Sequence, residues 1–283
     1  MKLMQTPIEE KFKMIIEKVE LAGKRAWEYF DADESTNEVK ADGSVVTAID
    51  KAIEADLMLA IRELFPEDSI IGEEGEGYLG TSEFVWHIDP IDGTDNFLRK
   101  IPFCAISVAR LGNTSEDSFG IVHNPITKQT YAALMEEGVY EREKVHVTNN
   151  SILGGRAVIS IGRGREYWMK SASYNLQKAL GTQFGKCSVY NCTALELSYI
   201  AANRIDGFLI FGLHSWDFAA GLYLIRAGGG VISVYGEAGW YEWTDSIKEL
   251  CSTHDRVIFA SHNGIHADAL QLIKNPRTWS DEE

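Results

Sequence analysis

The segment HIDPIDGTDNF, residues 87–97, places three carboxylates within a few positions of one another. Asp89, Asp92 and Asp95 follow the apolar run FVWHI and surround a proline and a glycine. Like charges at the end of a buried strand repel one another unless a cation lies among them. Mg²⁺ takes carboxylate oxygens together with substrate phosphate, so a magnesium site is one interpretation. The alternative is an Asx-rich turn between strands, which the same residue types also form.

Single residues of this segment suit different parts of a metal and phosphate site. Asp89 and Asp92 suit the coordination of a hard cation. Gly93 lets the backbone approach an anion closely, and Thr94 offers a hydroxyl and an N–H to a phosphate or a water. The segment could therefore bind a metal ion and a phosphate side by side.

Two further acidic segments favour the metal interpretation. Glu73 and Glu74 follow a short apolar run in SIIGEEGEG, and Asp217 lies in the first turn of a predicted helix, HSWDFAAGLYLIRAGGG. An acid in a first turn also interacts with the helix dipole, so a structural role alone is the alternative for Asp217. The small residues after it indicate a closely packed helix start, which suits the presentation of a carboxylate and N–H groups to a ligand.

The N-terminal half has the pattern of a helix pair followed by a sheet. Apolar residues at helical spacing predict a helix over residues 8–30 and a second helix after Thr47. Asp50 stands three positions after Thr47, close to a capping-box pattern. From residue 84, the short runs FVWHI, AISVARL, FGIVH and TYAALM predict a mostly antiparallel sheet.

The C-terminal half alternates between helices and strands, which predicts α/β layering. The expected helices cover residues 167–180, residues 193–204 and a stretch from Trp216, and the expected strands are KCSVY, GFLIF, GVISV and RVIFAS. No linker divides the chain, so we expect one compact unit over residues 1–283. An α+β half (about 1–150) would carry most metal ligands, and an α/β half (about 151–283) would complete the site.

Composition argues against some classes of partner. The 42 acids and 27 bases give a net charge of −15, which disfavours binding to nucleic acid or to an anionic membrane. The four cysteines, and likewise the seven histidines, lack metal-site spacing. No apolar stretch has the length of a signal sequence core or a membrane span. A cytoplasmic protein with reduced cysteines is expected.

Several segments together resemble one known family. IGEEG, WHIDPIDGTDNF and SWDFAAGLYLIRAGG resemble, in order and spacing, the motifs of the inositol monophosphatase family of magnesium-dependent, lithium-sensitive sugar phosphatases. KADGSVVTAID and NCTALELSYIAANRIDGF are also similar to that family, so the resemblance covers residues 8–270. It implies an α/β (α+β) fold, the layered αβαβα sandwich of the inositol monophosphatase/fructose-1,6-bisphosphatase type. It also implies two or three Mg²⁺ ions, a small-molecule phosphate ester as substrate, lithium sensitivity and a homodimer.

The resemblance also implies roles for single residues. The implied metal ligands are Glu73, Asp89, the carbonyl of Ile91, Asp92 and Asp217. Thr94, hydrogen-bonded toward Asp50, would position the attacking water, and Glu73 would polarise that water through the metal. The implied phosphate and substrate contacts are Asp92, Gly93, Thr94, Cys192, Thr193, Ala194 and Asp217. Phosphoryl transfer needs mainly positioning and charge neutralisation, so no protein nucleophile is required. For Asp50 the alternative is to satisfy the helix start, and one carboxylate could do both.

The sequence indicates the type of reaction more clearly than the identity of the substrate. DGTDNF resembles the inositol branch of the family, which makes inositol 1-phosphate the leading substrate. Against it, Ile210 stands where inositol enzymes commonly have a hydrogen-bonding glutamate, Cys192 stands where the family usually has glycine, and Asp95 replaces a Thr or Ser. Adenosine 3′,5′-bisphosphate, fructose 1,6-bisphosphate and histidinol phosphate are the alternatives. A regulatory binding protein is the competing class, although a vestigial site should have lost at least one carboxylate.

Overall fold

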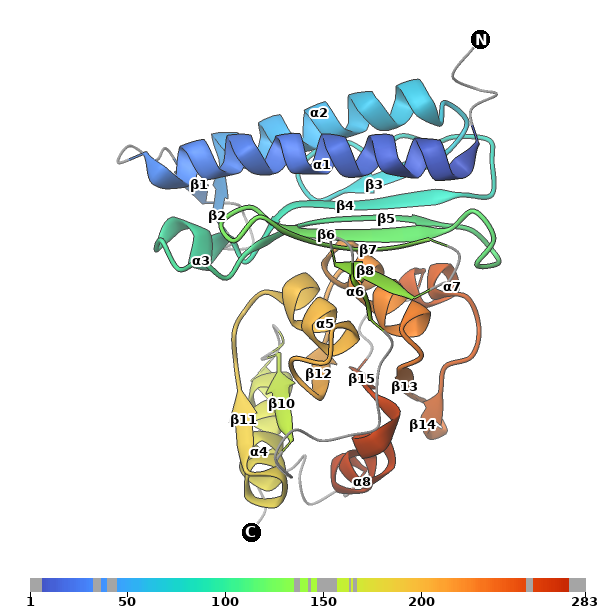
Figure 1. Ribbon diagram of the computed structural model, residues 1–283. Helices are drawn as coiled ribbons and strands as arrows, with labels where there is room; N and C mark the ends of the chain where they lie inside the picture. Colours follow the sequence, from blue (N-terminus) through green and yellow to red (C-terminus); the bar gives the residue numbers. More distant parts are fainter. Residues whose placement is uncertain are drawn as a thin grey trace.

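The structure of the protein is a computed structural model, which describes residues 7–32, 37–39, 45–134, 138–141, 144–146, 157–162, 164, 167–252 and 257–274. Figure 1 shows five layers: a helix pair, a sheet, a second layer of helices, a second sheet and a last helix layer. The predicted αβαβα fold class is confirmed.

The first layer consists of two helices, α1 (Ile8–Asp31) and α2 (Ala48–Leu64), which lie side by side over the first sheet (Figure 1). Both helices were predicted, because the apolar residues of each recur at helical spacing and are buried together with Trp86 and Phe119 of the sheet. The strands β1 (Asn37–Val39) and β2 (Val45–Thr47) form a small antiparallel pair before α2. The predicted cap from Thr47 involves a side chain outside the described residues. Within the described part of the chain, no helix has the length and apolar character needed to cross a membrane.

The first sheet has seven strands in the order β3-β4-β5-β6-β7-β8-β9. They are β3 (Ser69–Gly72), β4 (Val85–Asp92), β5 (Ala105–Leu111), β6 (Phe119–Asn124), β7 (Gln129–Leu134), β8 (Val139–Glu141) and β9 (Lys144–His146). Every pair is antiparallel except β3 with β4, so the prediction of a mostly antiparallel sheet is confirmed. Every residue of β5 and β6 is buried because helices cover both faces of the sheet.

The second sheet has six strands in the order β11-β10-β12-β15-β13-β14. They are β10 (Val158–Ile161), β11 (Lys186–Ser188), β12 (Gly207–Phe211), β13 (Val231–Gly236), β14 (Gly239–Glu242) and β15 (Val257–Ser261). The strands β11, β10 and β12 run parallel, whereas β15 pairs antiparallel with both β12 and β13. This half is therefore mixed rather than purely parallel.

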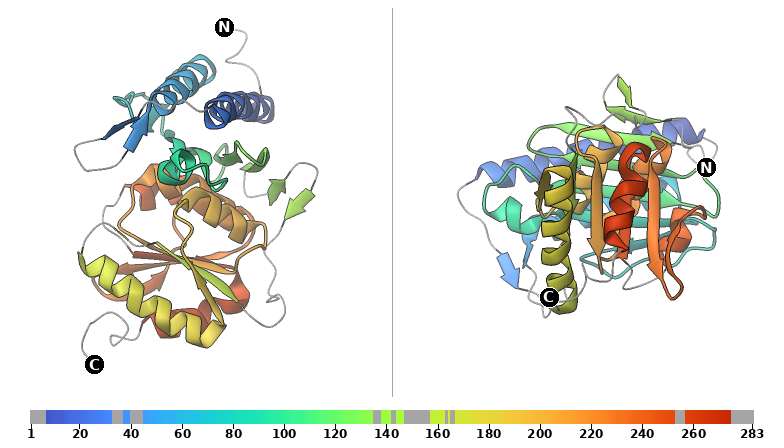
Figure 2. Two further views of the ribbon diagram at one scale, coloured as in Figure 1. Left: turned by 90° about the vertical axis from the view of Figure 1, so that its left-hand side faces the viewer. Right: turned by 90° about the horizontal axis from the view of Figure 1, so that it is seen from below.

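Helices cover both faces of the second sheet (Figure 2). The central layer holds α5 (Thr193–Ala201) and α6 (Ser215–Ala227), with the short α7 (Ile247–Cys251) beside them. The outer layer holds α4 (Tyr167–Phe184) and α8 (Asn263–Ile273). The sequence analysis did not predict α8. It also did not predict the short helix α3 (Thr94–Leu98), which follows β4 and Gly93.

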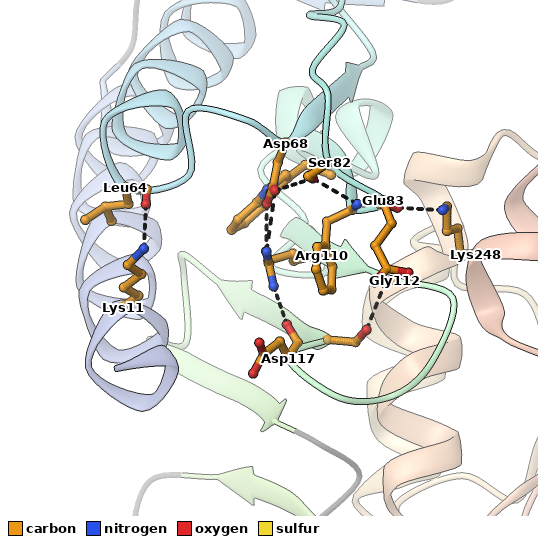
Figure 3. A network of polar contacts seen from close by, with 12 residues as sticks. Lys11, Leu64, Asp68, Ser82, Glu83, Arg110, Gly112, Asp117 and Lys248 are labelled. Atoms are coloured by element: carbon orange, nitrogen blue, oxygen red, sulfur yellow. Dashed lines mark hydrogen bonds and ion pairs between the residues drawn. The ribbon is translucent and has the colours of Figure 1, made fainter. Parts of the chain in front are cut away.

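A buried polar network fixes the N-terminal end of β4 (Figure 3). Arg110 Nε donates to Asp68 Oδ2 at 2.7 Å, and the Trp86 indole N–H donates to the same carboxylate at 2.9 Å. Lys248 of α7 donates to the backbone carbonyl of Glu83, which joins the second half of the chain to this end of the strand. The acids of the candidate site lie at and beyond the opposite end of β4.

Candidate active site

The site is built around a break in the pairing of β4. The register between β4 and β5 shifts between Asp89 and Asp92, where Pro90 cannot donate to the ladder. Asp89 is 1% exposed, and its Oδ1 accepts a hydrogen bond from the Ile91 N–H at 3.0 Å. The bulge therefore places two carboxylates of one strand at the same end of the sheet.

Asp89 lies at the centre of a group of carboxylates. Burial raises its pKa well above the ordinary value, and the neighbouring negative charges raise it further; they belong to Glu73, Asp92, Asp217 and Asp50. These acids come from four separate elements: α2, the loop after β3, β4 and α6. The charges of the other implied acidic ligands and of Asp50 thus all act on Asp89.

Asp92 connects β4 to the start of α5. Its Oδ2 accepts the Ala194 N–H at 2.6 Å, and its backbone carbonyl accepts the Cys192 S–H at 3.4 Å. Burial raises the pKa of Asp92 to about 7, against the opposing effect of the Ala194 hydrogen bond. The sequence analysis assigned the Ala194 and Cys192 positions to the phosphate. In the structure the Ala194 N–H already binds Asp92, and the Cys192 N–H binds Glu196 Oε2 at 3.2 Å.

The turn after β4 depends on glycine. Gly93 has φ +82°, and a Cβ at this position would lie 3.1 Å from each of three atoms, two of them in the 191–192 segment. Thr94 begins α3, and its hydroxyl donates to the Ile91 carbonyl at 3.1 Å. The hydrogen bond between Thr94 and Asp50 that the resemblance implied stays a prediction. The Ile91 carbonyl retains a second lone pair.

A buried carboxylate beneath the loop holds Glu73. Glu54 of α2 is 2% exposed, and its Oε2 accepts the Glu74 N–H at 2.9 Å. Burial raises the pKa of Glu54, while hydrogen bonds from the backbone of residues 73–75 lower it. Sequence reasoning missed this residue. Its signal was an acid four positions after Asp50, on the side of α2 that carries Ile53 and Leu57.

Asp217 is held at the start of α6 by two strands of the first sheet. Its carboxylate accepts the His214 N–H at 2.9 Å, as in a capping box. His87 of β4 forms a hydrogen bond with the Ser215 hydroxyl at 2.9 Å, and Ser107 of β5 donates to the Trp216 carbonyl at 3.3 Å. Burial lowers the pKa of His87 to about 4, so its ring is neutral near pH 7. His87 and Ser215 each stand two residues before an implied ligand, and this pairing was not predicted.

The 190–192 segment binds the short helix α3 through one side chain. The Asn96 amide donates at 2.8 Å to the carbonyls of both Phe103 and Tyr190. Asn191 has φ +58°, the left-handed conformation that glycine and asparagine tolerate, whereas Cys192 is extended at φ −151°. The left-handed residue of this segment is therefore Asn191, and the assignment of Cys192 to the family's glycine position stays a prediction.

The residues that differ from those usual in the family, and that bear on the choice of substrate, lie in different surroundings. Ile210 is fully buried in β12, where it pairs with Ile258 of β15. Asp95 is exposed in the first turn of α3. Thr193, the first residue of α5, is buried. Ile210 thus serves the core.

The acids fit a magnesium ion in charge and in donor chemistry. Carboxylate oxygens are the ligands that Mg²⁺ prefers, and a cation would relieve the repulsion that raises the pKa of Asp89. Within the described ranges, no three His, Cys, Asp or Glu side chains are grouped closely enough to hold a metal ion as they stand. The carboxylates of Asp89 and Asp92 each already accept a backbone N–H. The ligand set itself therefore stays a prediction.

Known proteins resemble this chain in sequence. The sequence model of the inositol monophosphatase family matches residues 8–275. The Nus factor SuhB of Escherichia coli strain K12 is 33% identical over 214 residues, which cover 74% of this chain and 78% of the relative. The Nus factor SuhB of Haemophilus influenzae is 33% identical over 218 residues, or 76% of this chain and 80% of the relative.

Solved structures share the fold. The extragenic suppressor protein suhB from Bartonella henselae has a TM-score of 0.80 at 22% identity, covering 96% of this chain and 100% of that chain. The IMPase of Thermotoga maritima has a TM-score of 0.75 at 24% identity, covering 93% and 96%. The inositol monophosphate-bound SaIMPase-II has a TM-score of 0.71 at 24% identity, covering 93% and 92%. By the family match and the SuhB relatives, this chain belongs to the inositol monophosphatase family.

Proposed function

We propose that this chain is a magnesium-dependent phosphomonoesterase of small polyol or sugar phosphates. One observation carries the proposal: negative charges from four elements act on the buried Asp89, an arrangement that is costly without a cation. Family membership supports the same chemistry. The intracellular setting expected from the sequence, with reduced cysteines and available Mg²⁺, is part of the proposal.

In this proposal Glu73, Asp89, the Ile91 carbonyl, Asp92 and Asp217 hold two or three Mg²⁺ ions. Bound Mg²⁺ supplies charge neutralisation for the phosphate and lowers the pKa of a coordinated water. Gly93 and Thr94 offer backbone N–H groups to the phosphate, where the open backbone of glycine permits close approach. Burial of Asp89 excludes bulk water from its carboxylate, which strengthens its interaction with cations.

Within the chain, Thr94 and Asp50 orient the attacking water. The Thr94 hydroxyl lies 3.1 Å from the Ile91 carbonyl and can turn toward a water near Glu73. Asp50 is buried on α2 and adds negative charge beside Asp89, so it can accept a proton or a hydrogen bond from that water. The oxygen of water forms the new bond to phosphorus, and the alcohol oxygen leaves with a proton.

Inositol 1-phosphate is the leading substrate of the proposal. DGTDNF favours it, and inositol monophosphate is the ligand of the SaIMPase-II structure that shares this fold. Ile210 offers no hydrogen bond to a ring hydroxyl, which keeps adenosine 3′,5′-bisphosphate, fructose 1,6-bisphosphate and histidinol phosphate as alternatives. Lithium inhibition and a homodimer also belong to the proposal, by family resemblance.

The test is phosphate release from these four compounds, with and without Mg²⁺, by the purified full chain. The proposal expects turnover on at least one compound that depends on Mg²⁺, and the highest kcat/KM identifies the substrate class. Asp95→Asn is a control for the loss of one negative charge near the site, because Asp95 is exposed and stands beside the implied ligands without being one of them. Turnover that is equal with Mg²⁺ and with a chelator would contradict the proposal.

The curated relatives favour a second candidate. They are named Nus factor SuhB rather than after a phosphatase activity. In this candidate the chain binds a regulatory partner, and its net charge of −15 disfavours a nucleic acid as that partner. No activity on any of the four esters, together with stoichiometric recovery of a protein partner, would favour this candidate over the enzyme.

A further inference from the structure

The buried Glu54 has no role in the proposed reaction, although a buried carboxylate is costly unless it is bound by donors. It lies on α2 one turn after Asp50, and its side chain points at the loop that follows β3. The loop contains the sequence GEEG at residues 72–75. The Glu74 N–H donates to Glu54 Oε2 at 2.9 Å, and the N–H groups of Glu73 and Gly75 also bind this carboxylate.

The two glycines of the loop allow its backbone to lie directly against this carboxylate. A Cβ at Gly72 would lie 2.5 Å from Glu54 Oε2, and a Cβ at Gly75 would lie 2.8 Å from Glu54 Oε1. Both distances are shorter than a normal contact, so a side chain at either position would force the loop or the end of the Glu54 side chain to move. The backbone on both sides of Glu73 thus lies in close contact with the Glu54 carboxylate.

We propose that Glu54 is a positioning residue of the metal site: its carboxylate binds the N–H groups of residues 73–75 and thereby directs the Glu73 side chain toward Asp89. The Glu73 charge acts on Asp89, as this orientation of the side chain requires. Hydrogen bonds from a second layer of residues set the orientation of metal ligands, and losing one typically weakens metal affinity about 10- to 100-fold. The proposal rests on the proposed function only through the metal, not through the substrate.

The experiment compares Glu54→Gln with Glu63→Gln in the full chain. Glu63 lies on the same helix and is exposed, so its substitution makes the same chemical change without touching the loop. Calorimetric titration with MgCl₂ should show about 10-fold weaker binding for Glu54→Gln and unchanged binding for Glu63→Gln. In turnover assays, Glu54→Gln should raise the Mg²⁺ concentration for half-maximal rate while kcat at saturating Mg²⁺ is largely retained. Mg²⁺ affinity within about twofold of wild type would overturn the proposal.

A second variant covers the case in which Glu54→Gln does not fold. Gly75→Ala displaces the same contact from the loop side, where the nearest atom is the flexible end of Glu54. It should weaken Mg²⁺ binding in the same direction, and wild-type affinity in this folded variant would overturn the proposal.

The outcomes separate this proposal from the proposed function. Wild-type protein that binds Mg²⁺ but hydrolyses no ester would refute the phosphatase, while the calorimetric comparison would still decide the role of Glu54. Wild-type protein that binds no Mg²⁺ would overturn both.

Discussion

Asp89 shows why these acids need a cation. It is buried among four other carboxylates, and its carboxyl group is already hydrogen-bonded to the Ile91 N–H. Because its pKa is raised in the folded chain, its contribution to stability is present below the unfolded pKa and is lost as pH rises through the folded pKa. Near neutral pH the metal-free protein therefore carries a cost that Mg²⁺ binding would remove.

Replacing Asp89 by asparagine should stabilise the metal-free protein. Asp89→Asn keeps an oxygen for the Ile91 N–H and removes the charge, so the free energy of unfolding should rise near pH 7. The gain should shrink as pH falls, because protonation removes the charge of Asp89 in the wild-type protein. Thermal unfolding with and without Mg²⁺ measures both effects. A variant that melts below the wild-type protein in a chelator would show that Asp89 is not a strained acid.

Glu196, which is not one of the implied ligands, provides a second pH-dependent test. It accepts hydrogen bonds from Ser160 and from the Cys192 N–H, and burial raises its pKa from 4.5 to about 7. Stability from this group is complete below pH 4.5 and is lost as pH rises through 7, a difference on the order of 3 kcal/mol. Glu196→Gln should therefore gain stability relative to wild type between pH 5 and 8, measured by urea unfolding at each pH. A difference in the free energy of unfolding between wild type and Glu196→Gln that does not change with pH would contradict the raised pKa of Glu196.

At the residue scale, the sequence indicated the acidic residues of the site better than the residues that hold them in place. Asp89, Asp92, Glu73 and Asp217 stand in recognisable motifs. The residues that hold them, such as Glu54, are single polar residues inside apolar patterns, and their partners lie far away in the sequence. The left-handed backbone at Asn191 was not predicted, because asparagine tolerates this conformation without requiring it.

The turn from β4 into α3 is the element on which the site depends most. It requires a left-handed residue at Gly93, and a Cβ there would lie 3.1 Å from each of three atoms, so that the neighbouring segment would have to shift. Gly239, in the turn from β13 to β14, also has a positive φ of +97°, but a Cβ there would meet no atom within 4 Å. Substitutions at Gly93 and Gly239 can therefore separate the effect of backbone strain from the effect of steric crowding.

Gly93→Ala should therefore cost more than Gly239→Ala. Each substitution carries about 1–2 kcal/mol of backbone strain, and only Gly93→Ala adds a steric clash that shifts the 191–192 segment. Urea unfolding should show a larger loss for Gly93→Ala, and turnover should fall only in that variant. Equal losses of stability and unchanged turnover would mean that the turn accommodates a side chain.

At the element scale, periodicity predicted the long helices and the buried strands well. Helices α1, α2 and α4 match the expected ranges to within a few residues. The short α3 and the mixed direction of the second sheet were not predicted. Five residues carry too little periodicity to show a helix, and strand direction depends on connections that a sequence pattern does not specify.

At the scale of the whole molecule, one hydrophobic core joins the two sheets. It contains Val122 and Tyr131 of the first sheet, residues of α5 and α6, and Phe208 and Ile258 of the second sheet. Since α6 carries Asp217 toward β4, the same packing brings the two halves of the site together. The division into an α+β half and an α/β half at about residue 150 stays a prediction.

We expect the chain to unfold in one cooperative transition that depends on the packing of α5 against α6. A Cβ at Gly221 of α6 would lie 2.5 Å from the Leu197 Cβ, whereas a Cβ at Gly181 of α4 would lie 3.6 Å from its nearest neighbour. Gly221→Ala should lower the single Tm by several degrees, and Gly181→Ala should leave it equal or higher because alanine favours a helix. Scanning calorimetry measures both. Two separated transitions would contradict a shared core.

The central claim is that carboxylates from separate layers act together on a phosphate ester through Mg²⁺. The most direct measurement is phosphate release by wild-type protein and by Asp217→Asn, on the fastest of the four esters, across a Mg²⁺ titration. We predict that wild-type turnover follows Mg²⁺ occupancy and that Asp217→Asn loses at least about 100-fold while remaining folded. A folded Asp217→Asn variant with near wild-type turnover would contradict the account.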